Sequence, residues 1–498
     1  MIKNLLFILF IKLLIRNSYS SIVIPLESLQ PITEEDLDNN SESKALITQL
    51  FNMNLVSTIK IGSESYPLKV FFNANNPFFY ISKNCFIAVS SSFNFKINFN
   101  YNRHQSKSFY NTSLFDKSFG KSFHACAAME DFQFLTDDKK ELKVEKINFI
   151  LNEDTNEKEP NCLHIGLIEN QYKESSFNDM NFVVQLKQKD YINGYIWSII
   201  YSNEKKNNNN NLLNDVEELL NLKGNMIIGD YPHEYDSNNF YESQFKHIYT
   251  LYNENIIKWE LKFNKIYFKN RDNKEQKIND YNAIFNPSIY YIKAPKDFFE
   301  TLLDDYFQQY IEMEVCDLYY FDEYISIYCD KSDKFSINDL KSFPTLYLEH
   351  ISFEYTFEFS YKDLFVEKDN IYWFLIISDT MFYTTGWTLG NIFMKNYQFT
   401  FNLETKEIGF YNPNLEKKNN NKNERYGEKT NIVLYIILIV ALVIILIGIG
   451  FFIKMKFYTK ISKKKRANEL DDDYEYIIDK KNNNIDQNVD NNKLFNNK

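Results

Sequence analysis

Glycine and proline are scarce in this chain, with 12 and 10 among 498 residues. So few flexible and helix-breaking residues exclude collagen-like and glycine-rich linker architectures. Lysine and arginine (56) are outnumbered by aspartate and glutamate (67), and the net charge is −11. No strongly basic surface can be inferred that would collect the phosphates of a nucleic acid, so we expect no nucleic-acid partner.

Several motifs of catalysis and ligand binding are also missing. The chain has no Gly-x-Ser-x-Gly turn and no phosphate-binding glycine loop, and its six histidines show no spacing typical of metal ligands. The sequence therefore predicts neither a metal site nor a cofactor.

Aromatic residues are abundant: 45 phenylalanines and 36 tyrosines supply most of an aromatic content of 17%, which favours β-sheet cores. Short runs rich in Ile, Val, Phe and Tyr recur between polar turns and predict strands. The expected strands include residues 55–61, 68–72, 78–81, 147–151, 226–228 and 259–268. Helical spacing of apolar residues is clearest at 182–187 and 295–306. The pattern predicts an all-β fold.

Two apolar runs indicate that the chain meets a membrane. Residues 1–20 combine an early lysine, a short apolar run and a small, polar end, which is typical of a cleaved signal peptide. Residues 432–453 carry no charge and, at about 1.5 Å per residue, can span a hydrocarbon core of about 30 Å. The cations of 454–466 have no acid among them, so the positive-inside bias predicts that the tail at 454–498 lies in the cytosol. The acidic and Asn-rich composition of this tail predicts that it is disordered. We therefore expect a type I membrane protein with one C-terminal transmembrane helix.

The remaining segments differ in composition. Residues 21–50 are polar and acidic and are interpreted as a leader or propeptide-like linker, and 412–431 as a stalk before the membrane. Glycosylation acceptors at Asn39 and Asn111 fit an ectodomain in the lumen or outside the cell. An odd number of cysteines, five, fits an oxidising compartment but leaves at least one without an intramolecular partner.

Four segments carry a family pattern. Phe-Phe-Asn-Ala-Asn at 71–75 follows a strand, Leu-His-Ile-Gly-Leu stands at 163–167, and Ala-Ile-Phe-Asn-Pro-Ser at 283–288. The fourth is Trp-Thr-Leu-Gly-Asn-Ile-Phe-Met-Lys-Asn-Tyr at 387–397. In this order and spacing they resemble the pepsin-like aspartic peptidases, such as pepsin and cathepsin D. The resemblance implies two β-barrel-like lobes, 51–245 and 246–411, with a substrate cleft between them.

The resemblance also locates the positions of the catalytic aspartates, which correspond to Asn73 and Asn286. An aspartic peptidase needs two carboxylates that share a proton, and a carboxamide cannot accept a proton from the attacking water. No Asp-Thr-Gly or Asp-Ser-Gly occurs anywhere in the chain. The residues that follow in the two cleft loops also depart from the family: Ala74, Asn75, Pro287 and Ser288.

The family often carries a disulfide in its second lobe, and the resemblance implies one here between Cys316 and Cys329. Cys85, Cys126 and Cys162 permit three alternative single pairings, among which the sequence does not choose.

The leading hypothesis is a membrane-anchored, catalytically inactive pepsin-like ectodomain that binds a peptide or protein in the secretory or endolysosomal pathway or at the cell surface. An active aspartic endopeptidase with a non-standard dyad is one alternative, and a structural surface protein with no ligand in its cleft is another. The two asparagines favour the binder. Residues 473–478 of the tail fit either a sorting signal read by an adaptor or a chance match in an Asn-rich segment.

Overall fold

The computed structural model forms two units, residues 1–418 and 419–498, which are described here separately. It describes residues 21–28, 46–47, 50–51, 55–74, 79–82, 85–90, 93–96, 103–111, 125–136, 140–152, 159–160, 163–167, 181–202, 213–253, 256–269, 275–277, 282–321, 323–380, 386–417, 448, 450 and 453–459. The predicted signal peptide lies outside these residues, as do almost all of the predicted span and most of the tail. Within the described part of the chain, no helix is both long and apolar enough to cross a membrane.

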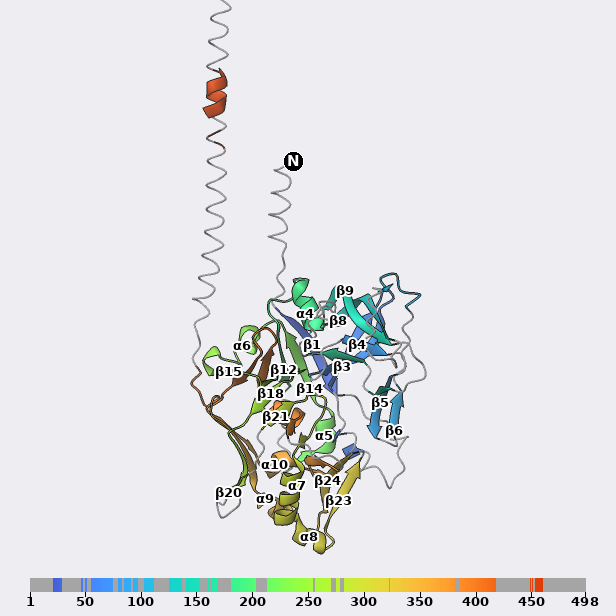
Figure 1. Ribbon diagram of the computed structural model, residues 1–498, viewed down its shortest axis with the longest axis vertical. Helices are drawn as coiled ribbons and strands as arrows, with labels where there is room; N and C mark the ends of the chain where they lie inside the picture. The colour runs from blue at the N-terminus through green and yellow to red at the C-terminus, as the bar shows by residue number, and fades with distance from the viewer. Residues whose placement is uncertain are drawn as a thin grey trace, which may run out of the picture. The chain divides into compact units, whose positions relative to one another are not determined.

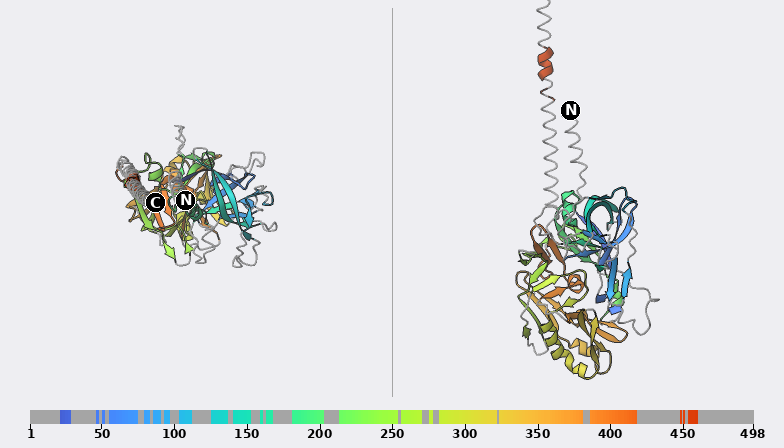
Figure 2. Two further views of the ribbon diagram at one scale, coloured as in Figure 1. Left: turned by 90° about the horizontal axis from the view of Figure 1, so that it is seen from above. Right: turned by 45° about the vertical axis from the view of Figure 1, so that its right-hand side comes forward.

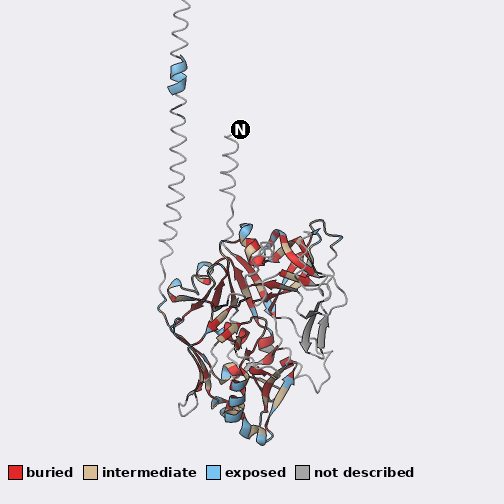
Figure 3. Cartoon of the chain, in the orientation of Figure 1, coloured by how far each residue is buried: buried red, intermediate tan, exposed pale blue. Residues whose placement is uncertain are grey.

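Strands dominate the first unit (Figure 1), and most of their residues are buried (Figure 3). The first half contains β1 (Ile22–Ser28), β2 (Leu55–Ile61), β3 (Tyr66–Asn73), β4 (Phe79–Ser82), β5 (Cys85–Ser90), β6 (Phe93–Lys96), β7 (Tyr110–Asn111), β8 (Ala125–Leu135), β9 (Glu141–Asn152), β10 (Glu159–Pro160), β11 (Leu163–Gly166), α4 (Phe182–Gln188), β12 (Ile196–Tyr201), β13 (Asn214–Asp215), α5 (Val216–Leu220), β14 (Lys223–Ile228) and α6 (Pro232–Tyr235).

The second half contains β15 (Phe245–Tyr249), β16 (Tyr252–Asn253), β17 (Ile256–Ile257), β18 (Glu260–Lys262), β19 (Lys265–Lys269), β20 (Glu275–Lys277), β21 (Asn282–Phe285), β22 (Ile292–Lys293), α7 (Lys296–Leu302), α8 (Gln308–Glu312), β23 (Cys316–Phe321), β24 (Tyr324–Asp330), α9 (Ile337–Lys341), β25 (Thr345–His350), β26 (Tyr355–Phe359), α10 (Tyr361–Leu364), β27 (Phe365–Lys368), β28 (Ile371–Phe374), β29 (Ile376–Asp379), β30 (Trp387–Leu389), α11 (Asn391–Asn396), β31 (Phe399–Asn402) and β32 (Glu407–Tyr411). The prediction of a mainly β fold is confirmed.

The predicted periodicities have clear structural counterparts. β2 coincides with the expected strand 55–61, and five of its seven residues are buried, in keeping with a strand inside a core. The expected helix at 182–187 is α4, which begins where the side chain of Asn181 accepts a hydrogen bond from the backbone N–H of Val184. Residues 259–268 form two strands, β18 and β19, instead of one.

The pairing of the strands repeats within the first unit. In the first half, β3 runs parallel to β11, β11 antiparallel to β4, and β4 parallel to β9. In the second half, β21 runs parallel to β30, β30 antiparallel to β22, and β22 parallel to β29. An antiparallel strand flanks each set on both sides: β2 and β8 in the first, β18 and β24 in the second. The unit is therefore internally duplicated, and Figure 2 shows the blue-to-cyan and yellow-to-orange strands as two groups.

Six antiparallel strands join the halves, in the order β1, β14, β12, β31, β32 and β15. At the junction β12 pairs with β31, and Trp197 stacks on Phe401 with ring centroids 4.1 Å apart. The indole N–H groups of Trp197 and Trp259 both donate to the carbonyl of Leu167, each at 3.1 Å. A buried carbonyl oxygen accepts two such bonds, so this one is fully used.

The interpretation of residues 21–50 as a linker is wrong for its first part. Residues 22–28 form β1, which pairs with β14 over six residues and with β2 over two. Ile22, Ile24 and Leu26 are buried in the core, so the alternating apolar residues supply the free energy that orders this strand. Acidic residues later in the segment masked this short period-two pattern.

Two covalent predictions fall in described regions. Cys316 and Cys329 face each other across the β23–β24 hairpin and form a disulfide, as the resemblance implied. Asn111 lies exposed on β7, whereas Asn39 lies outside the described residues. The side chains of Cys85, Cys126 and Cys162 also lie outside the described part.

Two fully buried strand serines offer a stability test. The hydroxyl of Ser326 donates to the carbonyl of Phe374 at 2.8 Å, whereas the Ser198 hydroxyl has no hydrogen-bond partner in the described structure. We expect Ser326→Ala to lower the free energy of unfolding by about 1 kcal/mol. Ser198→Ala should leave it unchanged or raise it, because burial of that hydroxyl is uncompensated. Urea unfolding of both variants checks this, and equal losses would contradict it.

Candidate functional site

The first candidate residue, Asn73, ends strand β3. Its backbone carbonyl accepts a hydrogen bond from the N–H of Leu167 at 2.9 Å, which continues the parallel pairing of β3 with β11. Asn73 is half-buried and the next residue, Ala74, is fully buried. Asn75 lies outside the described residues. The neighbouring strand therefore holds the backbone at this position.

The second candidate residue, Asn286, follows strand β21. Its backbone N–H donates to the carbonyl of Leu389 on β30 at 3.0 Å. Its side-chain oxygen accepts from the N–H of Ser288 at 3.0 Å, and this local turn holds the amide in place. Pro287, between them, is buried.

The internal repeat relates the two positions. β3 and β21 occupy the same place in the two sets of strands. β3 ends at Asn73 and β21 is followed directly by Asn286, and the backbone of each asparagine bonds to the parallel neighbour, at Leu167 and Leu389 respectively. Asn73 and Asn286 therefore stand at equivalent points of the duplicated structure. That their side chains lie within a few Å of each other stays a prediction.

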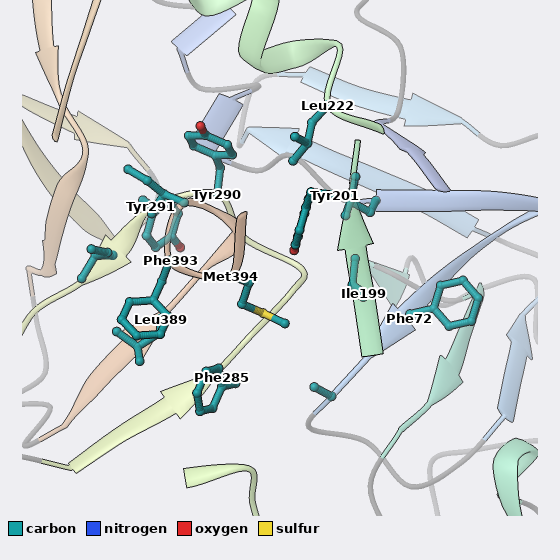
Figure 4. Close-up of a cluster of buried hydrophobic side chains, with 14 of the residues drawn as sticks. Phe72, Ile199, Tyr201, Leu222, Phe285, Tyr290, Tyr291, Leu389, Phe393 and Met394 are labelled. Atoms are coloured by element: carbon teal, nitrogen blue, oxygen red, sulfur yellow. The ribbon is translucent and has the colours of Figure 1, made fainter. Parts of the chain in front are cut away.

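A buried polar chain supports the loop after Asn286. The side chain of Asn391, at the start of α11, donates from Nδ2 to the carbonyl of Pro287 at 2.8 Å. The hydroxyl of Tyr201 on β12 donates to Asn391 Oδ1 at 2.5 Å. Burial, with Tyr290 nearby, raises the pKa of Tyr201 well above its ordinary value, so it stays protonated and remains a donor. Figure 4 shows Tyr201, Tyr290 and residues of α11 gathered in this cluster.

Sequence reasoning missed the role of Tyr201. Its separation of 190 residues from Asn391 leaves no local pattern to link them. The available signal in the sequence was Gly390-Asn391, which lies in one of the four segments that carry the family resemblance. The resemblance gave neither residue a role.

Gly390 allows residues 289–291, which follow Asn286, to pack closely against the chain at position 390. A Cβ built on Gly390 would stand 2.3 Å from the carbonyl oxygen of Tyr291 and 2.6 Å from that of Ile289. Both carbonyls accept backbone hydrogen bonds from this region, Tyr291 from Gly390 and Ile289 from Asn391. Only glycine allows this approach, so the glycine serves the geometry of the loop that carries Asn286.

Few buried acids are available for acid–base chemistry in the described part of the chain. Among the described residues, the buried acids are Glu130, Asp230 and Asp379. They lie on β8, after β14 and on β29, and Asp379 forms an ion pair with Lys293 at 3.2 Å. An ion pair with a lysine is a different arrangement from two carboxylates that share one proton. The described part of the chain also holds no cluster of three or more His, Cys, Asp or Glu side chains that could bind a metal.

The chemistry of the site follows from its side chains. An amide donates through its nitrogen and accepts through its oxygen at every pH of biological interest, but it has no proton to exchange. Asn73 and Asn286 can therefore hydrogen-bond a ligand without serving as general acid or base.

Comparisons with known proteins add little to this description. No protein-family model matches the chain. No curated protein matches it either. Among solved structures, basic 7S globulin from soybean is similar with 11% sequence identity and a TM-score of 0.49, over 79% of this chain and 96% of that chain. The description of the fold therefore depends on the strand pairings given above.

Gly386 and Gly390 flank strand β30, and they test whether the close packing at position 390 requires a glycine. We expect Gly390→Ala to lower the free energy of unfolding by about 3 kcal/mol, because the new methyl group overlaps two carbonyl oxygens. Gly386→Ala is the matched control, since its Cβ would meet only the carbonyl of Asn282 at 3.5 Å, and its effect should stay within about 1 kcal/mol. Denaturant unfolding of both variants measures the difference. Similar losses would show that the loop adapts freely.

Proposed function

We propose that this chain is a type I membrane protein whose pepsin-like ectodomain binds a peptide or protein without cleaving it. In this proposal residues 1–20 direct secretion, 432–453 anchor the protein, and 454–498 face the cytosol, where residues 473–478 are available to a sorting adaptor. The membrane belongs to the secretory or endolysosomal pathway or to the cell surface.

One observation carries the proposal: asparagines occupy both equivalent ends of the duplicated strands β3 and β21. The strand order, with its parallel, antiparallel and parallel pairings on each side, supports the pepsin-like assignment independently of sequence motifs. Loss of one carboxylate would remove the proton-sharing pair, and here both are absent.

The retained polar groups favour binding over a purely structural role. The loop after Asn286 is held by Asn391 and through it by Tyr201, all in buried positions. A loop held this way presents its half-buried amide in a defined position, which lowers the entropy lost when a peptide backbone binds. A surface coat would not require such an arrangement.

The proposal predicts the absence of peptidase activity. The purified protein should show no pepstatin-sensitive cleavage of peptides between about pH 3 and pH 7, where a carboxylate pair would work. Asn73→Asp combined with Asn286→Asp should restore little turnover. In the pepsin-like peptidases a hydroxyl residue follows each catalytic aspartate and braces its loop, and Ala74 and Pro287 have no hydroxyl. A misplacement of about 1 Å can cost on the order of a hundredfold.

A pepsin-like enzyme assayed beside the protein serves as the positive control. Cleavage by the unmodified chain, abolished by replacing another pair of acids, would favour the endopeptidase alternative. Retention of fluorescent peptides without cleavage would support the binder, and failure to retain any peptide would favour the surface-coat alternative.

The proposal also predicts topology. In sealed vesicles that protect the lumen, added protease should remove only residues after about 454, because the basic residues that follow the span keep this end in the cytosol. Antibodies against the ectodomain and against the tail, used on one immunoblot, report both ends. A protected tail would reverse the orientation.

A further inference from the structure

The folded unit ends at a well-defined place. After β32 the chain turns back along residues 241–244, where Asn412 N–H donates to the carbonyl of Gln244 at 2.9 Å. The Gln244 side chain donates to the carbonyl of Leu415 at 3.0 Å, and the Ser243 hydroxyl donates to that of Glu416 at 2.8 Å. The ammonium of Lys417 lies 5.7 Å from the ring centre of Tyr241. These contacts fix the point from which the chain continues toward residues 432–453.

The distance from that point to the predicted span is limited. Residues 418–431 number 14, and a fully extended chain of this length reaches about 50 Å at most. The chain therefore leaves the folded unit beside residues 241–244 and continues from there toward the predicted span.

The segment at this place is rich in aromatic side chains, most of them half-buried. We call residues 231–249, which include α6 and β15, the aromatic edge. Its aromatic residues and histidines are Tyr231, His233, Tyr235, Phe240, Tyr241, Phe245, His247 and Tyr249. β15 is the last strand at its end of the large sheet, so its outer edge has no neighbouring strand in the described structure.

Contacts between rings hold the side chains of the aromatic edge in place. Tyr231 stacks on His233 at 5.4 Å between centroids, and Phe245 contacts both rings at 5.0 and 5.4 Å. The hydroxyl of Tyr411 lies 2.7 Å from Nδ1 of His233 and ties the edge to β32. Tyr249, at the end of β15, is 75% exposed. Tyrosines with an apolar ring and a polar hydroxyl are enriched where proteins meet the membrane interface.

The charged residues of the aromatic edge favour a zwitterionic over an anionic lipid. The aromatic edge carries three acids, Glu234, Asp236 and Glu242, against one lysine, Lys246. Such a surface is repelled by anionic headgroups and not by zwitterionic ones.

We propose that the aromatic edge docks the ectodomain onto the bilayer interface, with zwitterionic phospholipid as its partner and Tyr249 inserted among the headgroups. The inference rests on the proposed membrane anchor.

A photo-crosslinking experiment with the full-length chain in phosphatidylcholine vesicles tests the inference. Tyr249 is replaced by p-benzoylphenylalanine, and Tyr320, on β23 in the second half, is replaced in a matched control. Tyr320 is similarly exposed, at 63%, and Figure 1 shows β23 at the bottom of the view and β15 at the left side. Illumination followed by mass spectrometry measures the lipid attached at each position.

We expect several-fold more phosphatidylcholine adduct at position 249 than at 320, and less adduct at 249 when phosphatidylserine replaces part of the lipid. Alkaline extraction of the same vesicles reports anchoring separately. Protein released by alkali would overturn both the anchor and the docking that depends on it. Anchored protein with equal adducts at the two positions, or with more at 320, would overturn the docking alone.

Discussion

The junction between β12 and β31 is the contact on which the rest of the folded unit depends. Here each half of the duplicated structure contributes one strand, and Trp197 of one lies flat on Phe401 of the other. The carbonyl of Leu167 accepts hydrogen bonds from both Trp197 and Trp259. Leu167 is also the residue whose N–H bonds to the backbone of Asn73. The joint between the halves and the first candidate loop thus share one residue.

The second loop is tied to the same joint by a different route. Tyr201 belongs to β12, and its hydroxyl reaches Asn391, which holds the carbonyl of Pro287. Both candidate loops are therefore positioned by the strands at the junction. In this arrangement the supporting bonds at Asn73 and Asn286 come from the backbone and from neighbouring side chains. An asparagine has nearly the shape of an aspartate but no proton to exchange.

The proposals for binding and for membrane docking concern different strands of the first unit. The candidate loops follow β3 and β21, inside the duplicated strands, whereas the aromatic edge lies on the last strand of the joining sheet. Docking through the edge would leave the loops free for a ligand in the lumen or outside the cell. The chain's acidic character, with a net charge of −11, is compatible with a neutral lipid surface and disfavours strongly acidic partners.

The sequence by itself determined the strand-rich class, the helix at 182–188 and the identity of the two asparagines, because periodicity and motif spacing are local properties of the chain. The sequence did not predict β1, because a strand in an acidic segment becomes ordered only when it pairs with β14. Only the tertiary structure decided that the strand pairings repeat, that Tyr201 supports a loop carried by the other half, and that residues 231–249 stand where the chain leaves the folded unit. Each of these depends on contacts between residues far apart in sequence, and the burial and hydrogen bonding that select such contacts exist only after the chain has folded.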